Sequence, residues 1–233
     1  MSDRWALVVA SALDADAGFV GDRLQQCGFV LRTVFRDGAG VPTTVAGAGH
    51  PDLIVLLGSE WSVHAPVEPR SLEVECELVR SARASGTPVL GLCYGAQVLA
   101  HAFGGRVSVA PAPEIGLVQV DTRDPELVPA GPWTAFHVDV LEPPPDATVV
   151  ASNSCGVQAF VLPGALGVQF HPEVRPGVLD GWAGRFPDLV RDAGLQQAVL
   201  VAQASDREDD SRRAAYALVD AFLARLVPAA TPP

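Results

Sequence analysis

A cysteine stands between two glycines in the segment GLCYG, residues 91–95, after an apolar run and before a helix-like pattern. This is the G-x-nucleophile-x-G form of a nucleophile elbow, whose glycines relieve crowding where a strand turns abruptly into a helix. Such a turn presents the side chain above the sheet at a helix N-terminus, where the helix dipole favours the reactive thiolate. We therefore predict that Cys93 is a nucleophile rather than a packed core cysteine.

A thiol nucleophile needs a general base, and one histidine stands at the end of a predicted strand. In the segment GVQFHPEV, His171 follows an apolar run, Pro172 stops the strand, and Glu173 comes two residues after the histidine. Side chains two residues apart in extended backbone project to the same side, so Glu173 could orient the imidazole that His171 turns toward Cys93. The pattern thus predicts a nucleophile, a base and an orienting carboxylate. The other histidines are His50, His64, His101 and His137.

Alternating apolar runs and helical patterns in the first half of the chain predict the elements that position these groups. The apolar runs at residues 5–11, 29–35, 52–58 and 87–93 are predicted strands. Residues 14–26 and 72–84 have helical patterns, and the second helix is expected to face its Glu and Arg side chains outward. This alternation favours an α/β fold with an open, mainly parallel sheet flanked by helices, and a nucleophile at the carboxyl end of the strands.

The second half of the chain has a different pattern of predicted secondary structure. Short β-like runs follow Gly105 with few helical stretches between them, which predicts additional antiparallel strands. These runs are RVSVA, LVQVD, WTAFHVDV, TVVAS, VQAFVL and GVQFH. The last helical pattern spans residues 209–226, and the tail at 228–233 is expected to be disordered. Because we find no internal repeat and no convincing linker, we expect one domain over residues 1–233.

Composition limits the partners and the compartment. The 233 residues are 48% hydrophobic, and 16 Lys+Arg against 27 Asp+Glu give a net charge of −11. This charge disfavours nucleic acid or an anionic membrane as the main partner. Four scattered cysteines, no signal segment and no apolar run near the roughly 20 residues that span a bilayer favour the cytoplasm. The sequence carries no zinc-binding, Walker A or dinucleotide-binding pattern, so no metal or cofactor is expected.

The elbow GLCYGAQ, the strand end GVQFHPEV and their order along the chain resemble the class I (triad) glutamine amidotransferase family. The similarity is greatest to the glutaminase domain of GMP synthases and its stand-alone relatives, and it includes the stretch FHVDVLEPPPDATVVASNSCGVQAF. The resemblance implies a flavodoxin-like α/β fold and a thioester mechanism. In that mechanism Cys93 attacks the side-chain amide carbon of glutamine, His171 passes a proton to the departing ammonia, and water hydrolyses the γ-glutamyl thioester.

The same resemblance implies an oxyanion hole made by backbone N–H groups. One donor would be Tyr94, directly after the nucleophile, and the other would come from the loop after the third strand. In this loop, LLGSEWSV, Gly58 matches the family's Gly-Gly-Pro pattern, while Ser59 and Glu60 replace its second Gly and its Pro. Ser59 still supplies a backbone N–H, but Glu60 brings bulk and charge near the mouth of the site.

Further positions resemble the family to different degrees. Gln97 matches a position associated with holding glutamine, although a surface helix residue is the alternative. His137 and Asp139 resemble a His-x-Asp pair that lies beside the site or the partner interface, and a structural role is equally open. Glu114 receives no catalytic role. Structural roles are expected for four residues: burial for Cys27, Cys76 and Cys155, and a packed or exposed helix position for His101.

Three functions remain open at this level. The first is a glutaminase that hydrolyses the side-chain amide of glutamine and releases ammonia for a separate synthetase. The second is a γ-glutamyl hydrolase or peptidase that acts on a γ-glutamyl amine, peptide or conjugate, since the same thioester forms from any γ-glutamyl amide. The altered GSEW loop motivates this alternative. The third is a catalytically inactive binding or regulatory module that retains the fold.

Overall fold

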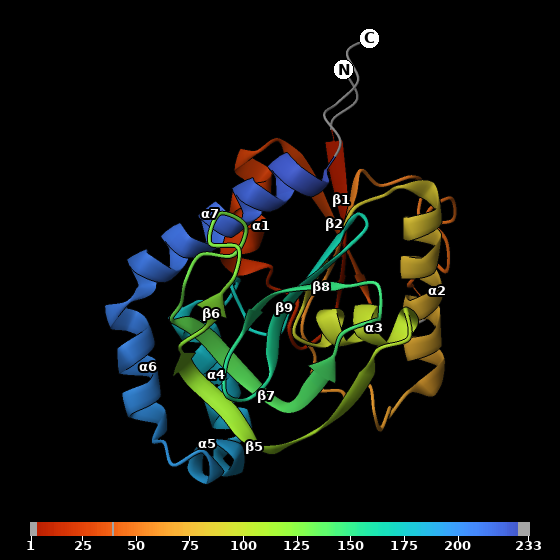
Figure 1. The fold of residues 1–233 in the computed structure, drawn as a ribbon. Helices are drawn as coiled ribbons and strands as arrows, with labels where there is room; N and C mark the ends of the chain where they lie inside the picture. The colour runs from red at the N-terminus through yellow and green to blue at the C-terminus, as the bar shows by residue number, and fades with distance from the viewer. Residues whose placement is uncertain (1–3, 39, 228–233) are drawn as a thin grey trace.

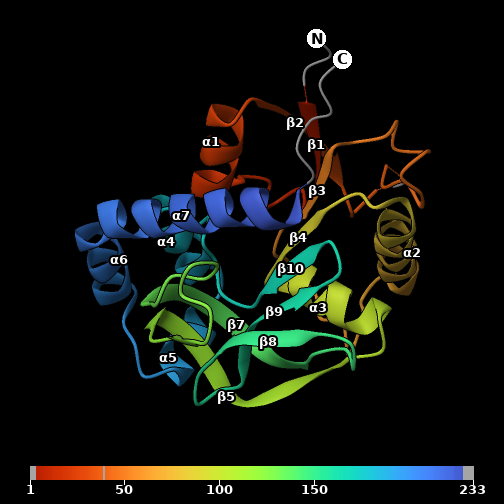
Figure 2. The same cartoon turned by 45° about the horizontal axis from the view of Figure 1, so that its top comes forward.

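The computed structural model describes residues 4–38 and 40–227, and its main feature is one twisted sheet. Within these residues the sheet has eight strands in the order β2-β1-β3-β4-β10-β9-β8-β6 (Figures 1 and 2). The first five strands of this order run parallel, and the last three are antiparallel to their neighbours. Their bounds are β1 Arg4–Ala10, β2 Phe29–Phe35, β3 Leu53–Leu56, β4 Val89–Leu92, β6 Asp121–Thr122, β8 Thr148–Ser152, β9 Val157–Leu162 and β10 Ala165–Val168.

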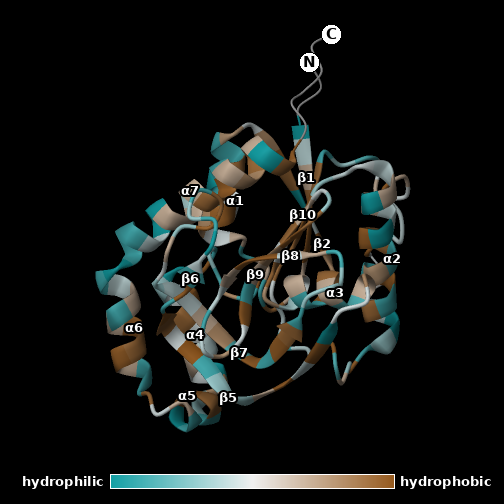
Figure 3. Cartoon of the chain, in the orientation of Figure 1, coloured by the Kyte–Doolittle hydropathy of each residue, from teal (hydrophilic) through white to brown (hydrophobic). Residues whose placement is uncertain are grey.

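The central strands are short and entirely apolar because helices cover both of their faces. Every residue of β3 (LIVL), β4 (VLGL) and β10 (ALGV) is buried. Continuous burial is typical of parallel strands in the middle of a doubly covered sheet. Colouring by hydropathy shows this apolar centre between more polar helix surfaces (Figure 3). The predicted α/β fold with a mainly parallel sheet and added antiparallel strands is confirmed.

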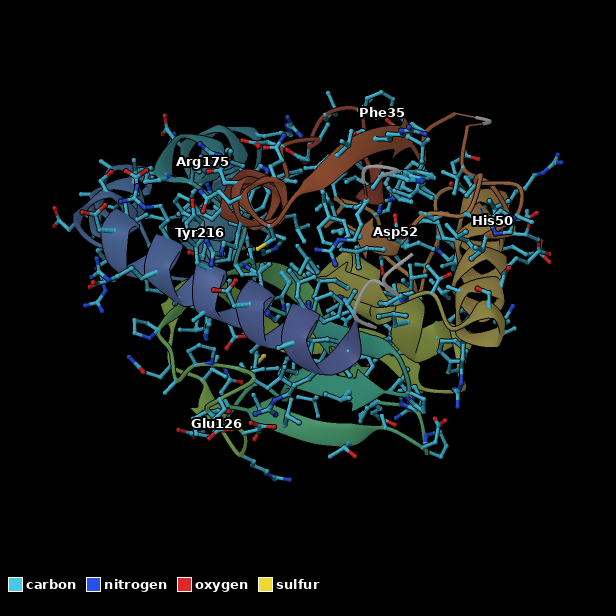
Figure 4. The ribbon with its side chains drawn as sticks, turned by 90° about the horizontal axis from the view of Figure 1, so that it is seen from above. Phe35, His50, Asp52, Glu126, Arg175 and Tyr216 are labelled. Carbon is cyan, nitrogen blue, oxygen red and sulfur yellow. The ribbon has the colours of Figure 1, made fainter. Side chains whose placement is uncertain are left out.

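Two pairs of helices cover the two faces. Helices α1 (Gly18–Gln26) and α7 (Glu208–Leu226) pack with one face of the sheet, and α2 (Pro69–Ser85) and α3 (Tyr94–Ala102) pack with the other. Sequence chemistry sets the ends of α2, since Pro69 occupies its first turn and Gly86 ends it in a left-handed conformation with φ of 71°. On the other face, Tyr216 of α7 and Arg175 both lie beside α1 (Figure 4), and Tyr216 accepts a 3.1 Å hydrogen bond from Gln26.

Strands β5 (Arg106–Val118) and β7 (Trp133–Glu142) form a separate antiparallel ribbon. The predicted runs RVSVA and LVQVD do not make two independent strands here. The first run and the start of the second belong to the single strand β5, whose register shifts between Val109 and Glu114. This irregularity lets the strand pass the intervening prolines, which cannot donate ladder hydrogen bonds.

Three helices between residues 176 and 206 are absent from the sequence-based expectation. Helices α4 (Pro176–Arg185), α5 (Pro187–Asp192) and α6 (Gln197–Asp206) gather beside β5 and β7 (Figure 1). They enclose a third apolar cluster that is separate from the two faces of the main sheet, and Leu179, Trp182 and Leu200 belong to it. None of the helices in the described part of the chain combines the length and hydropathy needed to cross a bilayer. The expected disorder at 228–233 concerns residues outside the described ranges.

One surface expectation for α2 is wrong. The sequence pattern placed its Glu and Arg side chains outward, yet Glu75 is fully buried. Its carboxylate accepts a 3.0 Å hydrogen bond from Nε of Arg36, which is also buried. A buried carboxylate is costly unless a cation and hydrogen bonds satisfy it, and Arg36 supplies both. The pair therefore lies inside the molecule, beneath the loop that follows β3.

Candidate active site

The turn from β4 into α3 has the geometry of a nucleophile elbow. Cys93 has φ of 48° and ψ of −106°, an unusual conformation for a residue with a side chain. The flanking glycines are required by close approach. A Cβ on Gly91 would lie 2.6 Å from the carbonyl oxygen of Gly95, and a Cβ on Gly95 would lie 2.2 Å from that of Leu56. The glycines thus let the strand, the helix and the neighbouring strand β3 meet around one buried thiol.

The side chains of His171 and Glu173 meet as the spacing predicted, although residues 172 and 173 form a turn and not the extended backbone that the prediction assumed. His171 lies just after β10, and its backbone N–H donates to the carbonyl of Thr134 at 2.7 Å, which ties it to β7. Its Nδ1 is 2.7 Å from Oε1 of Glu173, and both side chains are buried. Its Nε2 makes no well-formed hydrogen bond within the described residues, and the same ring lies beside the Cys93 thiol. The imidazole is therefore oriented from one side and available on the other.

The charge environment of His171 favours its protonated form. Burial lowers the pKa of this imidazole, but the neighbouring Cys93 and Glu173 outweigh burial and raise the pKa well above its usual value. The Trp182 ring packs edge-on against the imidazole at 4.7 Å between centroids. An imidazolium beside a thiol and a carboxylate can hold a thiolate and give a proton to a leaving group.

A glutamine that the sequence analysis missed contacts the thiol. The Nε2 group of Gln169 lies 3.5 Å from Sγ of Cys93, and Gln97 Nε2 donates to Oε1 of Gln169 at 3.3 Å. One signal could have found Gln169, because it belongs to the predicted strand GVQFH and stands two residues before His171, at the same spacing that separates His171 from Glu173. Gln97 is buried rather than on the surface.

The loop after β3 is anchored from below by Arg36. The guanidinium donates to the carbonyl oxygens of Gly58 at 2.7 Å and Leu57 at 3.0 Å, and it lies 4.8 Å from the ring centroid of Tyr94. In a trans peptide the N–H points opposite to the C=O, so the Ser59 N–H is turned away from Arg36. Burial raises the pKa of Glu75, and Arg36 opposes that rise. A lone arginine at a strand end gave no sequence signal for this role.

Gly58 itself must be a glycine. A Cβ at this position would lie 2.8 Å from Cε1 of His171 and 3.7 Å from Cβ of Cys93. The Ser59 hydroxyl is 2.9 Å from that of Ser11, so the first replaced family position bonds to the neighbouring loop. The loop therefore passes directly over the histidine and the cysteine.

A cavity of about 120 Å³, open to solvent, brings most of the predicted site residues together. Seven of them line it: Ser59, Cys93, Tyr94, Gln97, His137, Asp139 and His171. The other two, Gly58 and Glu173, line an adjoining cavity. Among the described residues no group of three or more His, Cys, Asp or Glu side chains is arranged to hold a metal ion.

His137 and Asp139 belong to a second polar cluster on β5 and β7. His137 Nδ1 is 2.9 Å from the carbonyl oxygen of Asp139, and its Nε2 is 2.9 Å from Oε2 of Glu114. Burial raises the pKa of Glu114, but the nearby His137 and hydrogen bonds from Asn153 and Gln158 outweigh it and leave that pKa below its usual value. Both ring nitrogens of His137 thus have an oxygen atom at 2.9 Å, although the contact of Nε2 with Glu114 is not a well-formed hydrogen bond.

The remaining candidates have ordinary surroundings. His101 is exposed on α3, as expected. Cys76 is buried, as expected, whereas Cys27 and Cys155 are only partly buried. Burial raises the pKa of Cys76 to about 11, which disfavours its thiolate. These three cysteines and His101 lie outside the cavity.

Comparison with known proteins agrees with this geometry. The family model for glutamine amidotransferase class-I matches residues 32–181, well over half of the chain. The chain belongs to the class I glutamine amidotransferase family. The matched range holds the elbow, the Gly58 loop and the His171–Glu173 strand end.

Among its relatives, this glutamine amidotransferase chain is similar to several GMP synthases. It is 41% identical to that of Aeropyrum pernix over 42% of this chain and 22% of the relative, and 34% identical to that of Parafrankia over 68% and 29%. The chain therefore spans less than a third of these two synthases. It is 35% identical to a GMP synthase subunit of Sulfurisphaera tokodaii over 53% of this chain and 68% of that relative.

Solved structures share the fold. A glutamine amidotransferase from Thermotoga maritima superposes with a TM-score of 0.83 at 21% identity, covering 96% of this chain and 99% of that one. A second, from Methylobacillus flagellatus, gives a TM-score of 0.81 at 21% identity over 98% and 97%. The described layers and strand order are thus those of glutamine amidotransferases.

Proposed function

We propose that this chain is a Cys-dependent glutaminase that hydrolyses the side-chain amide of glutamine. The observation that carries the proposal is the convergence of an elbow cysteine and a carboxylate-held histidine at one cavity. His171 has one ring nitrogen bonded to Glu173 at 2.7 Å and the other free of a well-formed bond beside Cys93. This is the arrangement of a nucleophile, a base and an orienting group.

In the first half of the reaction, the Cys93 thiolate attacks the amide carbon and forms a tetrahedral intermediate. Tyr94, the first residue of α3, has a backbone N–H at a helix N-terminus, where no intrahelical acceptor is available. The Ser59 N–H, turned away from Arg36, would be the second donor beside Gly58. His171 gives its proton to the departing nitrogen, so ammonia leaves and the γ-glutamyl thioester remains.

In the second half, water attacks the thioester carbon while His171 accepts its proton, and glutamate is released with regeneration of Cys93. Glu173 keeps the same ring nitrogen bonded in both halves and does not react. Gln97 would help to hold the substrate. Gln97 and His171 both line the cavity.

The ammonia would serve a separate synthetase, with residues 1–233 acting as one glutaminase domain. The relative from Sulfurisphaera tokodaii is named as one subunit of a GMP synthase, which supports a partner protein for this chain. The thioester chemistry itself requires no metal or cofactor, because a thiolate, an imidazole and water supply every reacting group.

The test is glutamate release from L-glutamine by the purified chain, with Cys93→Ala as the inactive variant and Cys76→Ala as the matched cysteine control. We expect Cys93→Ala to lose turnover by about 10⁴-fold or more because no thioester can form. Cys76→Ala should retain it, because Cys76 lies outside the cavity. Equal turnover by wild type and Cys93→Ala would refute the proposal.

A further inference from the structure

The cavity above Cys93 has two chemically different sides. One side carries hydroxyl and carboxylate groups from the loop after β3 and from β7, namely Ser59, Glu60, Ser62 and Asp139. The other side is apolar and comes from β5, β7, α4, α5 and the residue between these two helices: Ile115, Phe136, Trp182, Phe186 and Leu189. The amino group of a γ-glutamyl head can pair with the carboxylates of the polar side and finds no partner on the apolar side.

The apolar side is a continuous wall of side chains. The rings of Phe136 and Trp182 are 5.6 Å apart between centroids, and those of Phe136 and Phe186 are 6.3 Å apart. Phe136, Phe186 and Leu189 are only partly buried although they line the cavity. The protein alone therefore leaves apolar surface facing the cavity, where a ligand could cover it.

The position of His171 decides which part of a substrate meets this wall. In the proposed reaction His171 protonates the departing nitrogen, so that nitrogen must lie beside the imidazole. The imidazole itself packs edge-on against Trp182, at 4.7 Å between centroids. A substituent on the departing nitrogen would consequently extend along the wall, whereas ammonia from glutamine would leave the wall without a contact.

The charges around the wall favour a neutral substituent. Asp14 also lines the cavity, but its carboxylate accepts 2.7 Å and 3.5 Å hydrogen bonds from Trp182 Nε1 and Arg185. None of the described residues that line this cavity is a lysine or an arginine. An anionic substituent would thus lack a cation, and a cationic one that extended along the wall would meet Asp14, whose carboxylate is already bonded to two groups.

We propose that this chain also accepts γ-glutamyl amides of primary amines with an aryl or branched alkyl group, and that Phe136, Phe186 and Leu189 bind that group. The inference rests on the proposed thioester mechanism. The Cys93 sulfur forms a bond to the amide carbon, and the C–N bond breaks. The nitrogen takes its bonding pair and the His171 proton, so the primary amine departs, and water then hydrolyses the thioester to glutamate.

The experiment compares three substrates that share the glutamyl half: L-glutamine, γ-glutamylethylamide and γ-glutamylbenzylamide. Glutamate release gives kcat/KM for each, with Cys93→Ala as the blank. We expect the benzylamide to exceed the ethylamide by roughly 10-fold or more, because the phenyl ring is buried against the wall. Benzylamide turnover no faster than ethylamide turnover overturns the inference.

Variants of the wall locate the effect. Phe186→Ala, and independently Leu189→Ala, should lower the benzylamide-to-ethylamide ratio by about threefold or more, because each removes contact area from the wall. Phe35→Ala is the matched control, since Phe35 ends strand β2, does not line the cavity and is 45% exposed (Figure 4). A ratio unchanged in both wall variants overturns the assignment.

The two proposals fail in different ways. Cys93-dependent glutamate release from glutamine without a preference for the benzylamide overturns the amine-binding wall and leaves the glutaminase in place. Failure of all three substrates to release glutamate overturns both. A shift of the ratio in Phe35→Ala equal to that in Phe186→Ala also overturns the wall, because the effect would then be unspecific.

Discussion

Two buried histidines of this amidotransferase lie beside carboxylates, and a second neighbouring group distinguishes them. His171 is bonded to Glu173 through Nδ1, and the ring lies beside the Cys93 thiol. His137 has oxygen atoms 2.9 Å from both nitrogens, the Asp139 carbonyl and the Glu114 carboxylate. Neither Nε2 makes a well-formed hydrogen bond within the described residues, so the neighbouring group, a thiol or a carboxylate, is what differs. A carboxylate neighbour alone therefore does not make a catalytic base. We infer that His171 reacts and that His137 braces β5 against β7.

The largest expected difference is between the two histidine variants. His171→Asn should lower kcat/KM for glutamine by about 10³-fold or more, because general acid–base transfer is lost. His137→Asn should lower it by less than about tenfold and should mainly reduce the free energy of unfolding, because it removes contacts between strands. Steady-state glutamate release and urea unfolding measure both quantities. Equal losses of kcat/KM would place His137 in the chemistry.

A smaller effect is expected for the orienting carboxylate. Glu173→Gln keeps the shape of the side chain but loses the charge. It should lower kcat less than His171→Asn does, so that kcat of Glu173→Gln stays about tenfold or more above kcat of His171→Asn. Because Glu173 helps to raise the pKa of His171, that pKa should fall in the variant.

Titration of the His171 Cε1–H signal by NMR checks this direction, with exposed His101 as the internal control. Wild-type His171 should stay protonated to higher pH than the variant. An unchanged His171 titration combined with lost activity would contradict an orienting role for Glu173.

The smallest effect concerns the carboxylate partner of His137. The pKa of Glu114 is lowered on folding, so its ionised form stabilises the native state above the usual carboxyl pKa of about 4.3, and this contribution is lost as the pH falls through the lowered value. Glu114→Gln should therefore destabilise the protein at pH 7, and the difference from wild type should shrink as the pH falls below about 4.3. Urea unfolding at pH 7 and at a series of pH values below about 4.3 measures it, with exposed Glu77→Gln as the control. A pH-independent difference would argue against the ionised pair.

The site residues that the sequence predicted belong to short local patterns. Cys93 was recognisable because its flanking glycines indicate a crowded turn. The spacing of two between His171 and Glu173 correctly predicted that their side chains meet, but the backbone between them is a turn and not extended. The ion pair of Arg36 with Glu75 could not be predicted, because neither the segment around strand β2 nor helix α2 contains a pattern that indicates their contact. Long-range pairs of this kind leave no periodic signal.

The helices from 176 to 206 were missed for a related reason. Prolines at 176 and 187 open α4 and α5, a position that the sequence analysis did not use as a helix start. The helical period of α6 is weak because both its exposed and its covered positions include small apolar residues. Side chains of α4 and α5 build much of the apolar wall of the cavity, so the wall that we propose to bind the amine substituent was the least predictable part of the site.

The burial of Arg36 has a consequence for the solvent conditions under which the site keeps its shape. Dissolved ions screen charges across roughly 8 Å of solvent at physiological ionic strength, and they weaken exposed pairs such as Arg23–Asp220. They cannot approach Arg36 or Glu75, whose side chains have no exposed area. The cation beneath Gly58 and Tyr94 thus behaves as a counter-ion fixed to the chain by covalent bonds, which salt can neither dilute nor exchange.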